Sequence, residues 1–232
     1  MFKNRIGMNI NCVTCPVSTL CLSSDISENE RTKLNSMISR TVVLKKGEHL
    51  YFESEPMQNM FALYSGYCKE YSVDRDGNEK VFGFCYPGDL VAVESIHNKK
   101  YNYSCSAIKD SILCVIPCDE FFNLINTSPQ LLKRFVLLLS QRTSHSRNLT
   151  TSTNAKRRIA SFLMGLTTNT NQTDRDEQIY LPMSQIDIGN LLGMTHETVS
   201  RIFKGFQRKN IIKIKQKNVY INNKCLLESL AF

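Results

Sequence analysis

The stretch 185–206, QIDIGNLLGMTHETVSRIFKGF, decides the fold of the C-terminal part of the chain. Apolar residues in its second half recur at helical spacing, which predicts an amphipathic helix with one buried side. Gly193 stands where the chain must reverse, and Thr195 can cap the second helix. Gly189 has no side chain, so the second helix can pack closely across the first. The stretch therefore predicts a helix-turn-helix whose second helix buries Val199, Ile202, Phe203 and Phe206.

The other side of this second helix is polar and charged. A helix in the DNA major groove needs such a side, because Arg can hold guanine O6 and N7, Glu can accept from cytosine N4, and Ser can serve base or phosphate. We expect Glu197, Ser200 and Arg201 to read bases, and Lys204 and Arg208 to contact phosphates. An ordinary amphipathic helix pair is the alternative. The candidate DNA-contacting residues are His196, Glu197, Ser200, Arg201, Lys204 and Arg208.

Positive charge is concentrated in the same part of the chain. Residues 151–232 contain 12 Lys and Arg against 6 Asp and Glu, whereas residues 1–150 contain 17 against 15. A concentrated positive field favours a polyanion, and double-stranded DNA fits the helix-turn-helix. On charge alone, a solvated surface is the alternative. The alternating residues from 211 to 221 predict a small β-hairpin wing after the second helix.

Upstream, the sequence predicts a β-domain followed by a long helix. Five glycines between residues 47 and 88 separate short segments rich in Val, Phe, Tyr and Leu, which is typical of strands joined by turns. Asp76-Gly77 favours a tight hairpin turn. We expect residues of about 40 to 120 to form an antiparallel β-roll or jelly-roll. Ser128-Pro129 then predicts the start of a helix that runs to about Thr151, followed by a second helix after Asn154 and a polar loop at 167–178.

The N-terminal region carries a cysteine motif. Cys12, Cys15 and Cys21 have C-x2-C-x5-C spacing, and three thiolates on one short loop can wrap an iron-sulfur cluster or a zinc ion. The nine cysteines cannot all pair, and residues 1–10 offer no apolar signal core, so we expect a reducing cytoplasm and no membrane partner. One more ligand is needed. The candidates are Cys114, Cys118 and, behind them, Cys105.

Together these features resemble the cyclic AMP receptor protein (CRP/FNR) family, and within it the oxygen-responsive FNR-type regulators. The resemblance covers nearly the whole chain. It rests on the cysteine motif, SILCVIP around Cys114, the GDL turn at 88–90, NAKRRIASF at 154–162 and the helix-turn-helix. It implies an α+β fold with an N-terminal antiparallel β-roll, like a cyclic-nucleotide-binding jelly roll, and a C-terminal winged helix-turn-helix. The implied parts are a cluster-binding segment at 1–27, a β-roll sensor at 28–127, a dimerisation helix at 128–153 and a DNA-binding domain at 154–232.

The resemblance also implies a mechanism. An intact cluster would favour a homodimer that binds a TTGAT-like half-site repeated as an inverted pair, and the chain would act as a transcription activator. The surface turn at 74–80 resembles a patch that such regulators present to RNA polymerase. No Arg occurs between Arg75 and Arg134 to meet a nucleotide phosphate, so we expect no cyclic nucleotide. The implied ligands of a [4Fe-4S] cluster are Cys12, Cys15, Cys21 and Cys114.

Two alternatives remain at this stage. One is a regulator of the same fold with zinc or no metal in the cysteine site. The other is a metal-dependent barrel enzyme, which the sequence disfavours. Of the four histidines, His145 and His196 fall on predicted helices outside the barrel, and no H-x-H motif, phosphate loop or nucleophile elbow occurs. We therefore expect no enzymatic activity.

Overall fold

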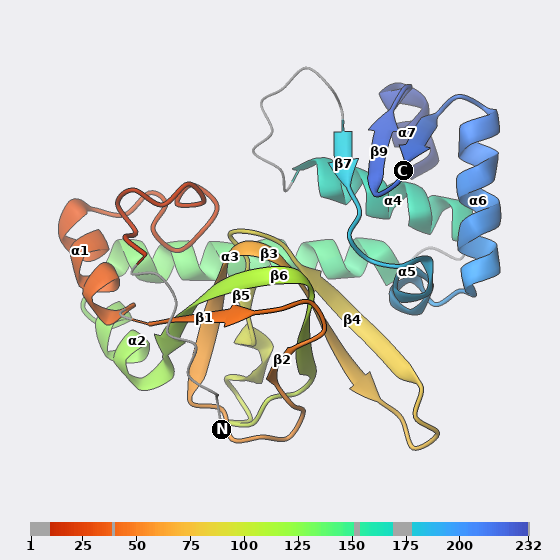
Figure 1. Cartoon of the computed structure of the whole chain (residues 1–232). Helices are drawn as coiled ribbons and strands as arrows, with labels where there is room; N and C mark the ends of the chain where they lie inside the picture. The colour runs from red at the N-terminus through yellow and green to blue at the C-terminus, as the bar shows by residue number, and fades with distance from the viewer. Residues whose placement is uncertain (1–9, 39, 151–153, 169–177, 232) are drawn as a thin grey trace. The chain divides into compact units, whose positions relative to one another are not determined.

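A computed structural model of the 232-residue chain describes residues 10–38, 40–150, 154–168 and 178–231, with side chains described except at 144–150 and 168. The chain divides into two compact units, Met1–Gln141 and Arg142–Phe232 (Figure 1). The last residues of the expected dimerisation helix, 151–153, and most of the loop expected at 167–178 lie outside the described residues. No helix in the described ranges combines the length and the apolar character that a bilayer crossing needs.

The first unit is built on the predicted antiparallel β-roll. Within the described residues its strands form a six-stranded sheet in the order β1-β6-β3-β4, with β2 paired to β6 and β5 paired to β3. The two longest strands, β3 and β6, pair along most of their length and so form the spine of the roll. The strands are β1 (Thr41–Leu44), β2 (His49–Tyr51), β3 (Asn59–Val73), β4 (Glu79–Cys85), β5 (Leu90–Val91) and β6 (Ser104–Pro117).

The β3–β4 hairpin confirms the predicted turn. The Asp74 carboxylate accepts hydrogen bonds from the N–H groups of Asp76 and Asn78, each at 2.9 Å. Gly77 has a φ of 82°, in the left-handed region that favours glycine. Local side-chain bonds and one permissive residue therefore fix the hairpin without help from the rest of the unit.

The interior of the roll is filled by side chains. The rings of Tyr51 and Tyr101 stack with centroids 3.8 Å apart, and Phe61 lies against Tyr51. Three thiols, those of Cys68, Cys85 and Cys105, are buried in the same cluster. A short 3-10 helix, η1 (Val93–Ser95), follows β5.

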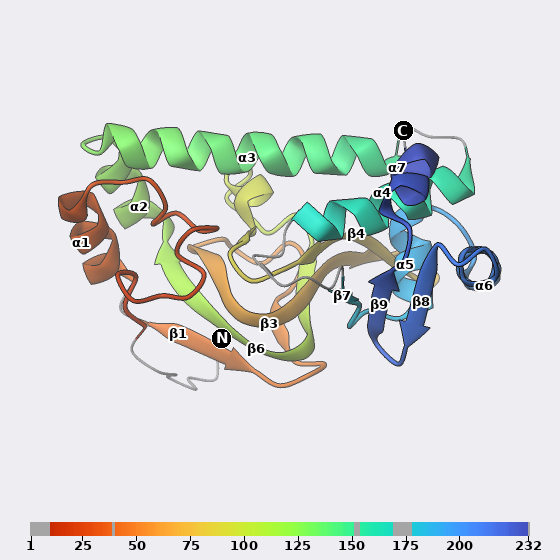
Figure 2. The ribbon, with the colours of Figure 1, turned by 90° about the horizontal axis from the view of Figure 1, so that it is seen from above.

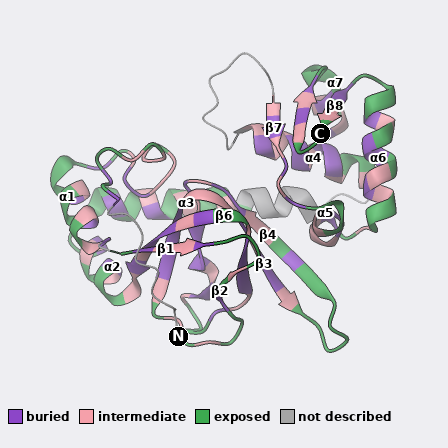
Figure 3. Ribbon diagram, in the orientation of Figure 1, coloured by how far each residue is buried: buried purple, intermediate pink, exposed green. Residues whose placement is uncertain are grey.

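A second core joins the roll to helices on either side of it in the sequence. These are α1 (Glu28–Met37), α2 (Cys118–Ile125) and the start of α3 (Pro129–Thr150), which lies along the roll in Figure 2. Leu131 and Phe135, one turn apart on α3, are buried in this core beside Cys12 and Cys114. In Figure 3 the buried residues accordingly line the inner side of these elements. The segment 28–127 thus holds α1 and α2 as well as strands, and neither helix was expected from the sequence.

The N-terminus of α3 has a different cap from the expected one. The helix begins at Pro129 as predicted, and the Leu132 N–H donates to the Ser128 carbonyl at 3.0 Å. The Ser128 hydroxyl, however, is buried and has no hydrogen-bond partner among the described residues. The Leu131 N–H donates instead to the carboxylate of Glu30, at 3.4 Å.

Glu30 also closes α1, on which it lies. Ser27 and Glu30 form a capping box: the Glu30 N–H donates to the Ser27 hydroxyl, and the Ser27 N–H donates to the Glu30 carboxylate. Burial raises the pKa of Glu30, but hydrogen bonds from Ser27 and from the first turn of α3 outweigh it and lower the pKa below its ordinary value. One buried carboxylate therefore serves two helix N-termini.

We expect the substitution Glu30→Gln to lower the free energy of unfolding by about 1–3 kcal/mol at neutral pH, since it weakens hydrogen bonds to a charged group. Because the folded-state pKa lies below the ordinary 4.5, this contribution is complete above that value and is lost as the pH falls through the folded-state pKa. Urea unfolding at neutral and acid pH measures it, with the exposed Glu28→Gln as control. An equal loss for both variants would contradict the shared-cap interpretation.

Candidate DNA-binding surface and cysteine site

The second unit contains the predicted helix-turn-helix. Helix α5 (Gln185–Leu192) ends at Gly193, whose φ of 61° is left-handed, and α6 (His196–Arg208) follows. The Thr195 hydroxyl accepts from the Thr198 N–H at 3.4 Å and caps α6 as expected. A Cβ on Gly189 would lie 2.6 Å from the Met194 carbonyl oxygen, so the close approach is confirmed and involves the turn itself. All four residues of the predicted apolar stripe of α6 are buried.

Two arginines of α4 (Ala155–Thr168) hold the ends of neighbouring helices. The Arg158 guanidinium donates to the Leu192 carbonyl, the last residue of α5, at 2.6 Å. The Arg157 Nε donates at 3.2 Å to the carbonyl of Ala231, the last residue of α7 (Lys224–Ala231). Cations at helix C-termini satisfy carbonyls that lack intrahelical partners. The NAKRRIASF segment therefore positions the helix-turn-helix.

The wing is larger than expected. Strands β8 (Ile212–Lys215) and β9 (Asn218–Ile221) form the predicted hairpin, and β7 (Gln178–Tyr180) adds a third strand beside β9. From the sequence, Gln178 is expected in a loop, and neither β7 nor α7 is predicted. Strand β7 packs against β9 and α4, and α7 packs against α4, while the outer side of α6 stays exposed.

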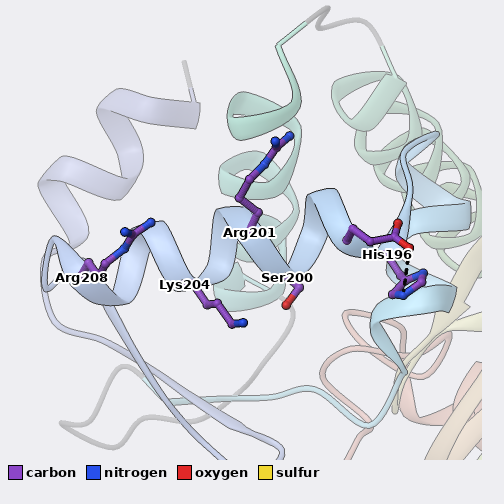
Figure 4. A pocket seen from close by; sticks show the side chains of 6 residues that line it. His196, Ser200, Arg201, Lys204 and Arg208 are labelled. Carbon is purple, nitrogen blue, oxygen red and sulfur yellow. Dashed lines mark ion pairs between the residues drawn. The ribbon is translucent and has the colours of Figure 1, made fainter.

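The six predicted DNA-contacting residues line one surface depression along α6 (Figure 4). Ser200 is half-buried and the others are exposed. His196 Nε2 lies 3.3 Å from Glu197 Oε1 at the helix N-terminus. The Glu197 backbone N–H and the Thr195 hydroxyl lower the pKa of the Glu197 carboxyl, which keeps it an ionised acceptor at neutral pH. The depression thus offers one acceptor carboxylate among cationic side chains.

The cysteine loop, defined here as residues 11–21, contains no regular helix or strand and is held by its surroundings. The Cys12 N–H donates to Asn35 Oδ1 of α1 at 2.8 Å. Arg134 of α3 donates to the carbonyls of Cys21, at 3.0 Å, and Thr19, at 3.2 Å. At the GDL turn, a Cβ on Gly88 would lie 2.4 Å from Leu20 Cβ. The loop is therefore packed against α1, α3 and the roll.

This packing brings the loop thiols close to one thiol of the roll. Burial, and then the charges of Cys21, Cys12 and Cys15, raise the pKa of Cys114 to about 12. Burial also raises the pKa of Cys12 to about 11 and of Cys21 to about 12, and that of Cys15 rises for the same reason. The four thiols thus lie within electrostatic reach of one another, and buried thiolates need a cationic partner to be stable.

The pKa values of the other two candidate ligands are raised by groups other than the loop thiols. Cys105 is buried in the roll with Cys68 and Cys85. Cys118 begins α2, and its pKa is raised by burial and by Asp119, not by the loop thiols. Cys118 also packs against the core that holds Cys12 and Cys114, but of the three cysteines that the sequence left open only Cys114 has its pKa raised by the loop thiols.

The residues around these thiols fit an anionic metal centre. Four soft thiolates are the donor set of [4Fe-4S] clusters, and also of structural zinc. The Nε of Arg31 is buried without a hydrogen-bond partner among the described residues, and its charge acts on Cys12. Within the described residues no three His, Cys, Asp or Glu side chains converge as a site for a single metal ion. The sequence did not indicate that Arg31 and Arg134 lie near the thiols. The Ser27-x-x-Glu30 pattern could have predicted α1, the helix that carries Arg31.

Comparison with known proteins agrees with this architecture. Residues 41–128 match the family model of the cyclic nucleotide-binding domain, and residues 157–230 match that of the Crp-like helix-turn-helix domain. The chain is 32% identical over 229 residues to the fumarate and nitrate reduction regulatory protein of Yersinia pestis. This match covers 97% of this chain and 92% of that relative. The chain belongs to the CRP/FNR family. It is accordingly a DNA-binding transcription regulator.

Further CRP/FNR similarity extends over sequence and fold. The electron transport regulator A of Shewanella oneidensis is 31% identical, over 99% of this chain and 95% of that relative. The structure of FixK2 from Bradyrhizobium japonicum matches with a TM-score of 0.74 at 23% identity, over 83% of this chain and 96% of that chain. TTHA1359, a CRP/FNR-family regulator from Thermus thermophilus, matches with a TM-score of 0.62 at 19% identity, over 82% and 97%. The predicted α+β fold class is confirmed.

The two glycines of the helix-turn-helix make a matched pair of tests. Gly189→Ala forces a Cβ against the Met194 carbonyl, so we expect a loss of about 1–3 kcal/mol in the free energy of unfolding. Gly205→Ala, in the interior of α6, meets nothing within 4 Å, so we expect a gain of up to about 1 kcal/mol from helix propensity. Chemical denaturation of both variants measures the difference, and equal effects would contradict the close approach at Gly189.

Proposed function

We propose that this regulator responds to oxygen through a [4Fe-4S] cluster held by Cys12, Cys15, Cys21 and Cys114. The observation that carries the proposal is the proximity of Cys114, from strand β6, to the three thiols of the cysteine loop. Relatives named for fumarate and nitrate reduction support it. When bound, the cluster supplies the oxygen-sensitive chemistry, because iron-sulfur centres with accessible irons are lost in air. Nine free thiols favour a reducing compartment, and we infer a cytoplasmic location.

The chain's own residues suggest how the cluster controls DNA binding. Three large apolar side chains of α3 are exposed: Leu132 by 43%, Val136, one turn further along, by 54%, and Leu137 by 46%. A second copy of α3 would cover them, so we infer a homodimer. Two α6 helices in such a dimer would meet half-sites about one helical turn apart, roughly 34–36 Å, on a TTGAT-like inverted repeat.

Two further parts of the proposal rest on the sequence. Contact with RNA polymerase through the β3–β4 turn at 74–80 stays a prediction. So does the absence of a cyclic nucleotide. The roll interior supports that absence, because the stacked rings of Tyr51 and Tyr101 occupy it and the roll offers no Arg for a phosphate after Arg75.

Purification under nitrogen tests the cluster. We expect a brown protein with about four iron and four sulfide per chain that bleaches in air, as the four-thiolate cluster implies. A colourless protein that retains zinc in air would favour the alternative of a zinc site.

Single substitutions test the fourth ligand. We expect Cys114→Ser to abolish iron and sulfide binding, because a hydroxyl is a poor ligand for this cluster. Cys118→Ser is the matched control, four residues along the chain with a pKa that the loop thiols do not raise, and should keep both. Retention of a full cluster by Cys114→Ser would make the ligand assignment wrong.

Binding to DNA tests the reading helix. Arg201→Ala should cost about 1–3 kcal/mol on the cognate palindrome and reduce discrimination at one base pair, since a bidentate contact to guanine is lost. Lys204→Ala is the control and should weaken binding to cognate and random DNA alike. Fluorescence anisotropy with both DNAs at fixed salt measures these losses. If Arg201→Ala weakened binding to the cognate and the random DNA equally, Arg201 would be a phosphate contact.

A further inference from the structure

The cysteine loop and α3 are joined by one side chain that the DNA-binding proposal does not use. Arg134, half-buried on the second turn of α3, spreads its guanidinium over two carbonyls of the loop. One of these carbonyls belongs to Cys21, a proposed cluster ligand. The bonds run from Nε to the Cys21 oxygen, at 3.0 Å, and from Nη2 to the Thr19 oxygen, at 3.2 Å.

The loop cannot move away from Arg134 without disturbing other contacts. Between the two bonded carbonyls, Leu20 lies against the GDL turn, where only a glycine fits at position 88. Leu22, directly after Cys21, is fully buried in the core that also holds Leu131 and Phe135. The backbone at 19–22 is therefore held between the roll and α3. Arg134 adds two hydrogen bonds to this apolar packing.

Arg134 also has a defined place around the axis of α3. At about 100° per residue, the buried stripe of Leu131 and Phe135 faces the core, Arg134 lies on one flank of it, and the exposed Leu132 and Val136 lie on the other. A contact on the Arg134 flank therefore fixes the rotation of the helix about its axis. That rotation sets the direction in which Leu132 and Val136 present themselves to a second copy.

We propose that Arg134 is a positioning residue that couples the cysteine loop to the dimerisation surface of α3. The proposal rests on the proposed function, because the loop is taken to hold the cluster. With Cys21 held as a ligand, the two carbonyls keep their places and Arg134 fixes the rotation of α3. When the loop is released, the guanidinium loses its acceptors, and α3 keeps its apolar contacts and its cap by Glu30.

The test compares three variants of the full-length protein purified under nitrogen. Arg134→Gln removes the charge and the paired N–H donors of the guanidinium. Arg134→Lys keeps the charge but offers one ammonium where the guanidinium spans two carbonyls. Lys133→Gln removes a charge from the exposed neighbouring position. The readouts are the dimer dissociation constant from analytical ultracentrifugation and amide hydrogen exchange in residues 17–24 and 129–136. Iron and sulfide are measured on every sample.

We expect Arg134→Gln to raise the dimer dissociation constant about tenfold, the size of one lost charged hydrogen bond, and to speed exchange in both segments together. Arg134→Lys should give an intermediate effect, and Lys133→Gln should match the wild type. Arg134→Lys keeps the test decisive if the glutamine variant does not fold. Faster exchange in the loop with unchanged α3 exchange and dimerisation would overturn the proposal, as would a glutamine variant that behaves like Lys133→Gln.

The design separates this proposal from the proposed function. An iron-free wild type would reject the cluster, while the exchange in the two segments would still report whether Arg134 links loop and helix. Conversely, a wild type with a full cluster and variants without any coupled change would reject Arg134 alone.

Discussion

The shared carboxylate of Glu30 is the interaction on which the arrangement of the first unit depends. The first turn of α3 contains no acidic residue, it begins with a proline, and the neighbouring Ser128 hydroxyl has no hydrogen-bond partner among the described residues. The N–H groups that every helix leaves free at its start must nevertheless be satisfied when they are buried. Glu30 does this from 101 residues away, after closing its own helix. The start of α3 is thereby completed by the segment that follows the cysteine loop.

The second unit uses the same principle at the opposite helix ends. Arg158 and Arg157 of α4 satisfy the last carbonyls of α5 and α7, so the ends of the helix-turn-helix are fixed from behind. All four residues of the apolar stripe of α6 are buried in the core of this unit. The outer side of α6 consequently takes no part in the core, and its charged residues stay exposed for DNA. In both units a charged side chain sets where a helix begins or ends, and apolar packing sets which way it faces.

Local patterns predicted those parts of the molecule that local interactions determine. The β3–β4 hairpin follows from Asp74 and Gly77, and the helix-turn-helix follows from its glycines and apolar spacing. The six residues expected on the DNA-facing side of α6 do line one depression. Helix α1 was missed although its capping box stands in the sequence. The second role of Glu30 and the contacts of Arg134 could not be predicted, because they join residues about 100 positions apart and no periodicity records such a pairing.

The same distinction explains why the fourth cysteine was undecided from spacing. Cys105, Cys114 and Cys118 all belong to or adjoin β6, and alternation along a strand sends neighbours to opposite sides while leaving open which side the loop covers. Cys12 and Cys114 pack in one core with Leu131 and Phe135, and the loop thiols raise the pKa of Cys114 but not that of Cys118, which supports Cys114 as the proposed fourth ligand. Close-packed cores transmit small displacements instead of absorbing them. A displacement of these thiols therefore shifts the residues of α3 that pack in the same core. The separate aromatic cluster inside the roll can remain rigid.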